Sequence, residues 1–267
     1  MVALSARPFP AALCNGYAIT CMHDSRKGFA ELQRRYFEAA EVERFRWTTG
    51  SAGFAETEDE LLSPVLDLIE SPCLEIGCGE GNNLVRLGRR ARCFGVDLFR
   101  RKLHFAARAV PHAVFTVAEA TALPFSDAAF GSVFIRDLLH HVPHPADVVA
   151  QAVRVLAPGG TLCILEPNGR NPIVLLQTLL VAAEARARES DVDHLTRLLR
   201  KLPLGEVRIE TRQPLPLRRM ALHYRYGVPA LGRSAGLRRV LAATESWLGR
   251  LLPAERWSYV LVTARRN

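Results

Sequence analysis

The sequence lacks an apolar run of about 18 to 20 residues, the length that a membrane-spanning helix requires. The best candidate, residues 173–183, is interrupted by Gln177 and followed by Glu184 and two arginines, so an amphipathic helix explains it better. The N-terminus also lacks the long apolar core and the small-residue cleavage site of a secretion signal. We therefore expect neither a membrane span nor export.

Cysteine occurs six times, but the spacing matches no zinc-binding or disulfide pattern. Four of the six, Cys73, Cys78, Cys93 and Cys163, fall in or beside predicted buried strands, where cysteine acts as a small apolar residue. The sequence therefore predicts a reducing, cytoplasmic location and no metal site.

Positive charge is concentrated near the C-terminus. The whole chain of 267 residues has a net charge of +8, whereas residues 196–267 carry fifteen Lys and Arg against four Glu, a net charge of +11. A basic face of this kind suits an anionic surface, such as membrane headgroups, nucleic acid or an acidic carrier. Arginine on solvated helix faces explains the same composition, and both interpretations stay open.

From about residue 57, short apolar runs alternate with helical patterns. This alternation predicts a parallel sheet with helices on both faces, an α/β doubly wound fold. We expect residues 57–267 to form one domain with a helical insertion at 171–201. Residues 1–56 form an N-terminal extension with a helix-prone stretch at 26–45; its first 21 residues are either disordered or precede a true start at Met22. The expected strands cover residues 73–76, 93–96, 113–117, 132–135, 161–165, 206–211 and 257–263, and the expected helices cover 58–69, 83–90, 101–109, 146–156, 173–187, 192–201 and 237–252.

A glycine-rich loop, Glu75-Ile76-Gly77-Cys78-Gly79-Glu80-Gly81, directly follows the first predicted strand. Glycine allows a tight turn and a close approach of the backbone to a ligand. The dinucleotide fingerprint needs a glycine at position 82, where this chain has Asn82, and the lysine of a phosphate-binding loop is missing. The loop alone leaves an NAD site among the alternatives.

Two carboxylates favour a different nucleoside ligand. Asp97 ends the second predicted strand, 20 residues after the first glycine of the loop, where it can accept hydrogen bonds from both hydroxyls of a ribose. Glu75 places a second negative charge beside the loop, which suits a ligand with an ammonium and a sulfonium and repels a pyrophosphate. The electrostatics therefore favours S-adenosylmethionine over NAD.

With these motifs the sequence resembles the class I S-adenosylmethionine-dependent methyltransferases, in particular the group that acts on small molecules. The resemblance runs from about residue 74 to residue 168, with the blocks in the order and at the spacing of that family. Besides the glycine loop and Gly95-Val96-Asp97, the blocks are Ala118-Glu119-Ala120-Thr121-Ala122-Leu123-Pro124-Phe125, Phe130-Gly131-Ser132-Val133, Leu138-Leu139-His140-His141-Val142, Leu156-Ala157-Pro158-Gly159-Gly160-Thr161 and Glu166-Pro167-Asn168.

The resemblance implies a Rossmann-like seven-stranded sheet with an antiparallel last strand, and helical lids before the first strand and after the fifth. It also implies a cofactor site. The methionine part of the cofactor would contact Glu75, Gly77, Cys78, Gly79 and Gly81. The ribose would contact Asp97, with Leu98 beside it, and the adenine would contact Glu119 and Ala120. Arg136 would lie between the methionine end and the acceptor. Glu119 stands where the family usually has the shorter Asp.

His140 and His141 are the candidate catalytic residues, because histidine titrates near neutral pH and can act as a general base. Helix packing or lining of the acceptor pocket explains the same pair, since the pair recurs in the family whatever the acceptor.

The resemblance predicts methyl transfer to a small molecule. The lids would be residues 26–54 and 171–201, and the second begins with an apolar stretch, so we expect a hydrophobic, lipid-like acceptor methylated on oxygen or carbon rather than nitrogen. The basic tail would then contact a membrane surface or an acidic carrier. A nucleic acid or protein substrate is an alternative, but the Asn/Asp-Pro-Pro-Tyr/Phe motif of amino-methylating DNA enzymes is absent at residues 136–139. A non-catalytic nucleotide-binding protein of the same fold is a further alternative.

Overall fold

The structure is a computed structural model that describes residues 25–38, 47–48, 50–224 and 227–267. The expectation for residues 1–21 lies outside these ranges, as does the end of the helix predicted over 26–45. The rest of that prediction corresponds to α1 (Ser25–Glu38). None of the helices within these ranges is long and apolar enough to cross a bilayer.

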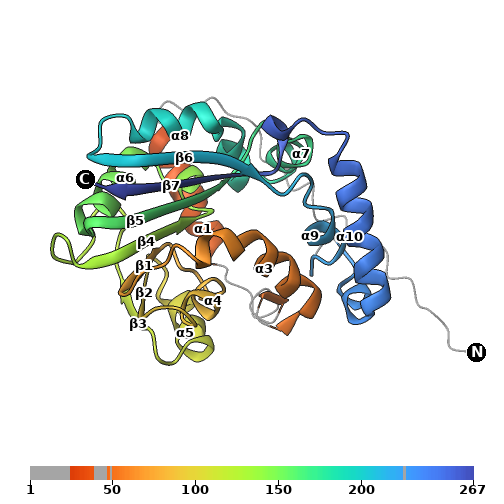
Figure 1. Ribbon diagram of the computed structural model, residues 1–267, viewed down its shortest axis with the longest axis horizontal. Helices are drawn as coiled ribbons and strands as arrows, with labels where there is room; N and C mark the ends of the chain where they lie inside the picture. The colour runs from red at the N-terminus through yellow and green to blue at the C-terminus, as the bar shows by residue number, and fades with distance from the viewer. Residues whose placement is uncertain (1–24, 39–46, 49, 225–226) are drawn as a thin grey trace, which may run out of the picture.

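Seven strands form one sheet (Figure 1). The predicted seven-stranded sheet with an antiparallel last strand is confirmed, because the final strand runs antiparallel to both of its neighbours while the first five strands pair in parallel. The strands are β1 (Cys73–Ile76), β2 (Cys93–Asp97), β3 (Val114–Val117), β4 (Phe130–Arg136), β5 (Leu156–Pro167), β6 (Leu204–Arg212) and β7 (Tyr259–Arg266), and their order in the sheet is β3-β2-β1-β4-β5-β7-β6.

Helical segments connect the strands. After α1, the described part of the chain forms α3 (Ala52–Leu66), α4 (Leu84–Leu87), α5 (Arg100–Ala109), η1 (Leu139–His141), α6 (Pro145–Val155), α7 (Pro172–Leu180), η2 (Ala182–Glu189), α8 (Val192–Leu199), α9 (Leu217–Ala221), η3 (Pro229–Arg233), α10 (Ala235–Gly249) and η4 (Ala254–Arg256), where η marks a 3-10 helix.

Strand β1 is buried along its whole length, and because successive side chains point to opposite sides of a sheet, it contributes to a core on each face. Leu74 and Ile76 of β1 belong to a core cluster with side chains of α6 and α8. Cys73 belongs to a second cluster with side chains of α3, α4 and α5. Glu75 alternates with Leu74 and Ile76 and therefore lies on the side of α4, behind the glycine loop.

Three predicted helices differ from the observed ones. The helix expected over 58–69 begins earlier, at Ala52, and ends at Leu66 as α3. The helix expected over 83–90 is the single turn α4. The helix expected over 173–187 ends at Leu180, where Val181 adopts an extended conformation with φ −124° and ψ 104°, since the following segment packs against α1 and η1. The chain then continues as η2, which buries Ala183 and Ala187. At the other end, Asn171 caps α7 by accepting hydrogen bonds from the next backbone amides.

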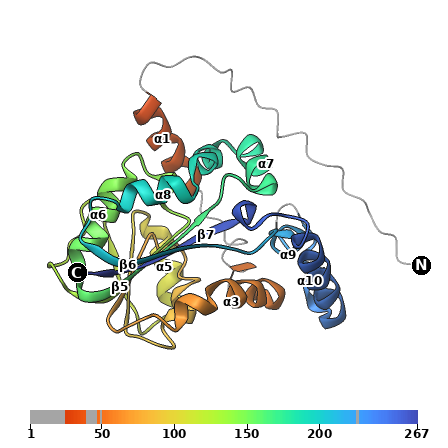
Figure 2. The same cartoon turned by 45° about the horizontal axis from the view of Figure 1, so that its top comes forward.

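The segments outside the central sheet gather at two places. In Figure 2, α1 lies on the same side of the molecule as α7 and α8, and Gln33 Nε2 of α1 donates a hydrogen bond to the Ala183 carbonyl of η2 (2.5 Å). Figures 1 and 2 both show α3 beside α9 and α10. Ion pairs join these elements: Arg238 lies 2.8 Å from Glu56, and Arg218 binds Glu60.

Candidate functional site

The glycine loop turns at the carboxyl end of β1, between the ends of β2 and β4, where open α/β sheets bind ligands. Gly77, Gly79 and Gly81 all have positive φ values, 75°, 51° and 81°, a backbone region that favours glycine. The amides of Gly77 and Cys78 donate to the Val96 carbonyl at the end of β2 (2.8 and 3.0 Å). The loop is thereby fixed against the strand that carries Asp97.

The Asp97 carboxylate organises two turns of backbone. Its Oδ2 accepts a hydrogen bond from the Gly79 amide (2.9 Å), and its Oδ1 accepts one from the Phe99 amide (2.8 Å). Next to it, Leu98 is 40% exposed, so an apolar side chain lies at the rim beside a fixed carboxylate. This pairing suits a nucleoside, which offers hydroxyls and an apolar ring.

Glu75 lies behind the loop and is fully buried. Its Oε1 accepts a hydrogen bond from Asn83 Nδ2 (2.5 Å), and Oε2 has no hydrogen-bond partner among the described residues. Burial penalises the charged carboxylate and raises the pKa of Glu75 from 4.5 to about 8.

Arg136, the last residue of β4, forms a buried ion pair with Glu58 of α3. Its NH1 and NH2 groups donate to the two carboxylate oxygens of Glu58 (2.5 and 3.1 Å), and NH1 also donates to Asn83 Oδ1 (2.8 Å). Burial alone would raise the pKa of Glu58, but the charges of Arg136, Arg219 and Arg86, together with the hydrogen bond from Arg136, outweigh burial and lower it. Arg136 therefore joins the central sheet to a helix that precedes it in the chain.

A second arginine reaches the same place from the C-terminal part of the chain. Arg219 of α9 donates to the Tyr259 hydroxyl, and its nitrogens lie 3.8 Å from Glu58 and 3.9 Å from Asp137. The Tyr259 hydroxyl in turn donates to Asp137 Oδ2 (3.3 Å). Two arginines and two carboxylates thus balance one another around Tyr259.

One cavity of about 550 Å³ joins these groups, within the usual range of small-molecule sites. Its polar part is bounded by the glycine loop, Asp97 and the two arginines. Its other walls carry apolar side chains from α1, α3, the turn between β2 and α5, and the segment after β4. They include Phe37, Phe54, Phe99, Leu138, Val142 and Pro143.

Most of the residues predicted to bind a cofactor line this cavity. Glu75, which is buried behind the loop, and Gly81, which packs against Ala106 of α5, do not line it. Of the described lining residues, none comes from the predicted insertion 171–201, whereas α1 contributes several. The predicted residues that do line the cavity are Gly77, Cys78, Gly79, Asp97, Leu98, Glu119, Ala120 and Arg136.

Comparison with known proteins agrees with this geometry. Residues 74–164 match the family described as a methyltransferase domain. Within residues 74–164, the chain carries a methyltransferase domain of the class I S-adenosylmethionine-dependent type.

The relatives that the chain resembles carry names for different methyl acceptors. The chain is 33% identical over 99 residues to 27-O-demethylrifamycin SV methyltransferase of Amycolatopsis mediterranei, covering 34% of this chain and 36% of the relative. It is 30% identical over 160 residues to trans-aconitate 2-methyltransferase of Variovorax paradoxus, covering 55% and 61%. The chain thus spans less than two thirds of either relative.

A solved structure shows the same fold. Geranyl diphosphate C-methyltransferase from Streptomyces coelicolor, in complex with Mg²⁺, geranyl diphosphate and S-adenosylhomocysteine, superposes with a TM-score of 0.61 at 18% identity. The superposition covers 90% of this chain and 98% of that one.

The glycine loop has room for S-adenosylmethionine. A Cβ on Gly79 would meet no atom within 4 Å, and Gly79 lines the cavity, so the backbone here faces open space that a ligand can fill. A Cβ on Gly77, in contrast, would lie 2.9 Å from the Leu138 side chain. The residues present therefore fit S-adenosylmethionine.

The two adjacent histidines, His140 and His141, have different surroundings. His140 does not line the cavity, and its Nδ1 and Nε2 lie 2.7 Å from Glu166 and 3.3 Å from Glu184. Burial alone would lower the pKa of His140, but the two carboxylates outweigh it and raise the pKa to about 10. A protonated imidazole does not act as a base, so His140 does not suit that role. His141 lines the cavity, with the Phe37 ring packed edge-on at 4.8 Å.

The sequence did not point to Glu58, Asn83, Phe37 or Arg219. Glu58 and Arg136 are separated by 78 residues, and Arg219 lies outside the family match. Their roles arise from long-range contacts, which leave no local spacing pattern.

Proposed function

We propose that this chain transfers a methyl group from S-adenosylmethionine to an oxygen or carbon atom of a small, mainly hydrophobic molecule. The observation that carries the proposal is the cavity of about 550 Å³ that joins the glycine loop and Asp97 to a wall of aromatic and aliphatic side chains. The location that suits this activity is the cytoplasm.

The residues of the chain contribute to catalysis by aligning the acceptor with the methyl group of the cofactor. S-adenosylmethionine, when bound, supplies a methyl group that its sulfonium activates for displacement. Gly79 and Asp97 are already held by their mutual hydrogen bond, so binding needs little reordering of the loop. Phe37 and Leu138 then exclude water next to the acceptor. Positioning of this kind contributes roughly 7 to 11 kcal/mol to catalysis.

The charged side chains at the polar end of the cavity favour an uncharged acceptor. Arg136 is bound by both oxygens of Glu58, and Arg219 lies between Glu58 and Asp137. Since carboxylates balance both arginines, an anionic acceptor would gain little there. Similarity to 27-O-demethylrifamycin SV methyltransferase supports an oxygen acceptor, and similarity to geranyl diphosphate C-methyltransferase supports a carbon acceptor. Of the histidine pair, we propose that His141 contacts the acceptor.

Calorimetry tests the cofactor part of the proposal. We expect S-adenosylmethionine and S-adenosylhomocysteine to bind with micromolar Kd and NAD not to bind. Asp97→Ala should weaken binding at least tenfold, about 1.4 kcal/mol, because the loop loses its anchor and the ribose its carboxylate. Asp67→Ala is the matched control, since Asp67 is exposed and pairs only loosely with Arg90 at 3.4 Å.

An acceptor screen tests the rest. With a labelled methyl group, we expect label in an organic-soluble product of cell extract incubated with the protein. Label that enters only nucleic acid or protein would overturn the small-molecule acceptor, and tight binding of NAD alone would overturn the cofactor.

A further inference from the structure

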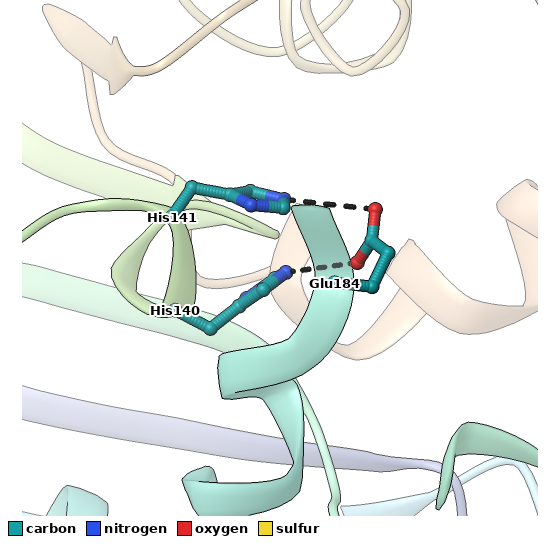
Figure 3. Close-up of side chains that lie close together, drawn as sticks. All are labelled: His140, His141 and Glu184. Atoms are coloured by element: carbon teal, nitrogen blue, oxygen red, sulfur yellow. Dashed lines mark hydrogen bonds and ion pairs between the residues drawn. The ribbon is translucent and has the colours of Figure 1, made fainter. Parts of the chain in front are cut away.

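Three side chains that can bind metal ions converge beside the cavity. His140 and His141 belong to η1 and Glu184 belongs to η2, and Figure 3 shows both imidazoles directed toward the Glu184 carboxylate. One donor atom from each residue lies within 4.8 Å of the other two. The Nε2 atoms of His140 and His141 lie 3.3 and 3.9 Å from the Glu184 oxygens.

The orientation of His140 is fixed from behind. Glu166 of β5 accepts hydrogen bonds from the amides of Leu138 and Leu139 (2.7 and 2.9 Å). The same carboxylate lies 2.7 Å from His140 Nδ1, so Nε2 is turned toward Glu184. Histidines that bind metals commonly have a carboxylate on the other ring nitrogen, which orients the ring and increases its basicity.

We propose that His140, His141 and Glu184 bind a divalent cation of the zinc class. The cation replaces the proton that Nε2 of His140 carries toward Glu184, and binding releases this proton to solvent. Two imidazoles and one carboxylate, with a position left open, form a donor set that zinc uses in proteins. Donors about 2.1 Å from a tetrahedral ion are about 3.4 Å apart, so the His140–Glu184 spacing of 3.3 Å already fits. The three donor atoms lie within 4.8 Å of one another, so the His141 ring has to move inward for all three to bind one ion. The site is reachable, because the side chains of His141 and Glu184 are 10% and 18% exposed.

The cation would connect two parts of the chain. Glu184 belongs to the insertion outside the family match, whereas His141 lines the cavity. Binding therefore ties η2 to the cavity wall and holds the ring of His141 in place. This inference goes beyond the proposed methyl transfer and does not depend on it.

Equilibrium dialysis against Zn²⁺ tests the site, using protein without a histidine tag, treated with a chelator and free of S-adenosylmethionine. We expect about one Zn²⁺ per chain, and Co²⁺ should give the visible absorption of a site with nitrogen and oxygen donors. Glu184→Gln and His141→Ala should each weaken Zn²⁺ binding at least tenfold. These variants avoid the fully buried His140, whose loss threatens folding, and their melting curves without metal verify that they fold.

Two matched controls separate this site from adventitious binding. Glu189→Gln removes an exposed carboxylate from the same η2 segment, and His104→Ala removes an exposed histidine of α5. Both should bind Zn²⁺ like the natural chain. The proposal is overturned if the natural chain binds no Zn²⁺, or if Glu184→Gln and His141→Ala bind as tightly as the controls. Cofactor calorimetry is independent of either result.

Discussion

At the scale of single residues, Glu75 has a carboxyl group in a position where its charge is costly. It is buried behind the glycine loop, with one hydrogen bond from Asn83, and Arg136 only partly compensates for burial. With a pKa of about 8 in the folded chain against 4.5 ordinarily, Glu75 holds a proton between these values that the unfolded chain releases. The free energy of unfolding therefore falls as pH rises through this window.

Replacing Glu75 by Gln should remove this dependence. The natural chain should lose stability from pH 5 to pH 8 with an added slope of up to about 1.4 kcal/mol per pH unit, whereas Glu75→Gln stays neutral and lacks that contribution. Urea unfolding at pH 5, 6, 7 and 8 measures the difference. Parallel curves for the two proteins would show that Glu75 ionises normally.

At the scale of elements, η2 contacts the cavity wall from outside. Arg186 NH1 donates to the Val142 carbonyl (2.7 Å), and its guanidinium lies 4.9 Å from the Phe29 ring of α1. One side chain thus joins η2 to the segment after β4 and to α1. Val142 itself lines the cavity, so the position of η2 affects the acceptor side.

Arg186→Gln should loosen η2 without disturbing the sheet. We expect hydrogen exchange at residues 182–189 to become at least several-fold faster, because the contact to Val142 is lost, while β4 and β5 exchange as before. Arg188→Gln is the control, since its side chain is 59% exposed and its ion pair with Glu189 is long (4.0 Å). Equal exchange in both variants would mean that Arg186 does not hold the segment.

The sheet could be predicted from sequence because its signals are local. Short apolar runs, glycines that need positive φ, and Asp97 at a strand end all lie within a few residues of the structure they determine. The break at Val181 had no comparable signal, because η2 is shaped by packing against α1 and η1. His140 and His141 also look alike in the sequence. Their different environments depend on Glu166 and Glu184, which are 26 and 44 residues from His140 along the chain.

At the scale of the whole molecule, part of the basic C-terminal charge is used internally. Arg218 binds Glu60 and lies 3.2 Å from Glu245, and Arg238 lies 2.8 Å from Glu56. These contacts fix α9 and α10 against α3. Arginines that are paired in this way contribute little to a surface that binds nucleic acid or membranes. For this part of the basic charge, a structural role is therefore the better interpretation.

Arg218→Met should destabilise the whole fold. Glu245 is only 4% exposed at its side chain, so losing Arg218 leaves a buried carboxylate without its charged partner, at a cost of about 2 to 3 kcal/mol. Arg212→Met serves as the control, because its partner Glu210 is half exposed and the change should stay within about 0.5 kcal/mol. Urea unfolding compares the two, and an equal effect would contradict the role of Arg218.

The ion pair between Glu58 and Arg136 also limits how this protein can be recombined with its relatives. The family match, residues 74–164, contains Arg136 but neither Glu58 nor Arg219. In a hybrid that keeps residues 74–164 of this chain and takes the segments before and after them from a relative, Arg136 would face the relative's residue at the position of Glu58. We therefore expect folded, active hybrids only where the segments before and after residues 74–164 come from the same protein and the first segment has a carboxylate at the position of Glu58.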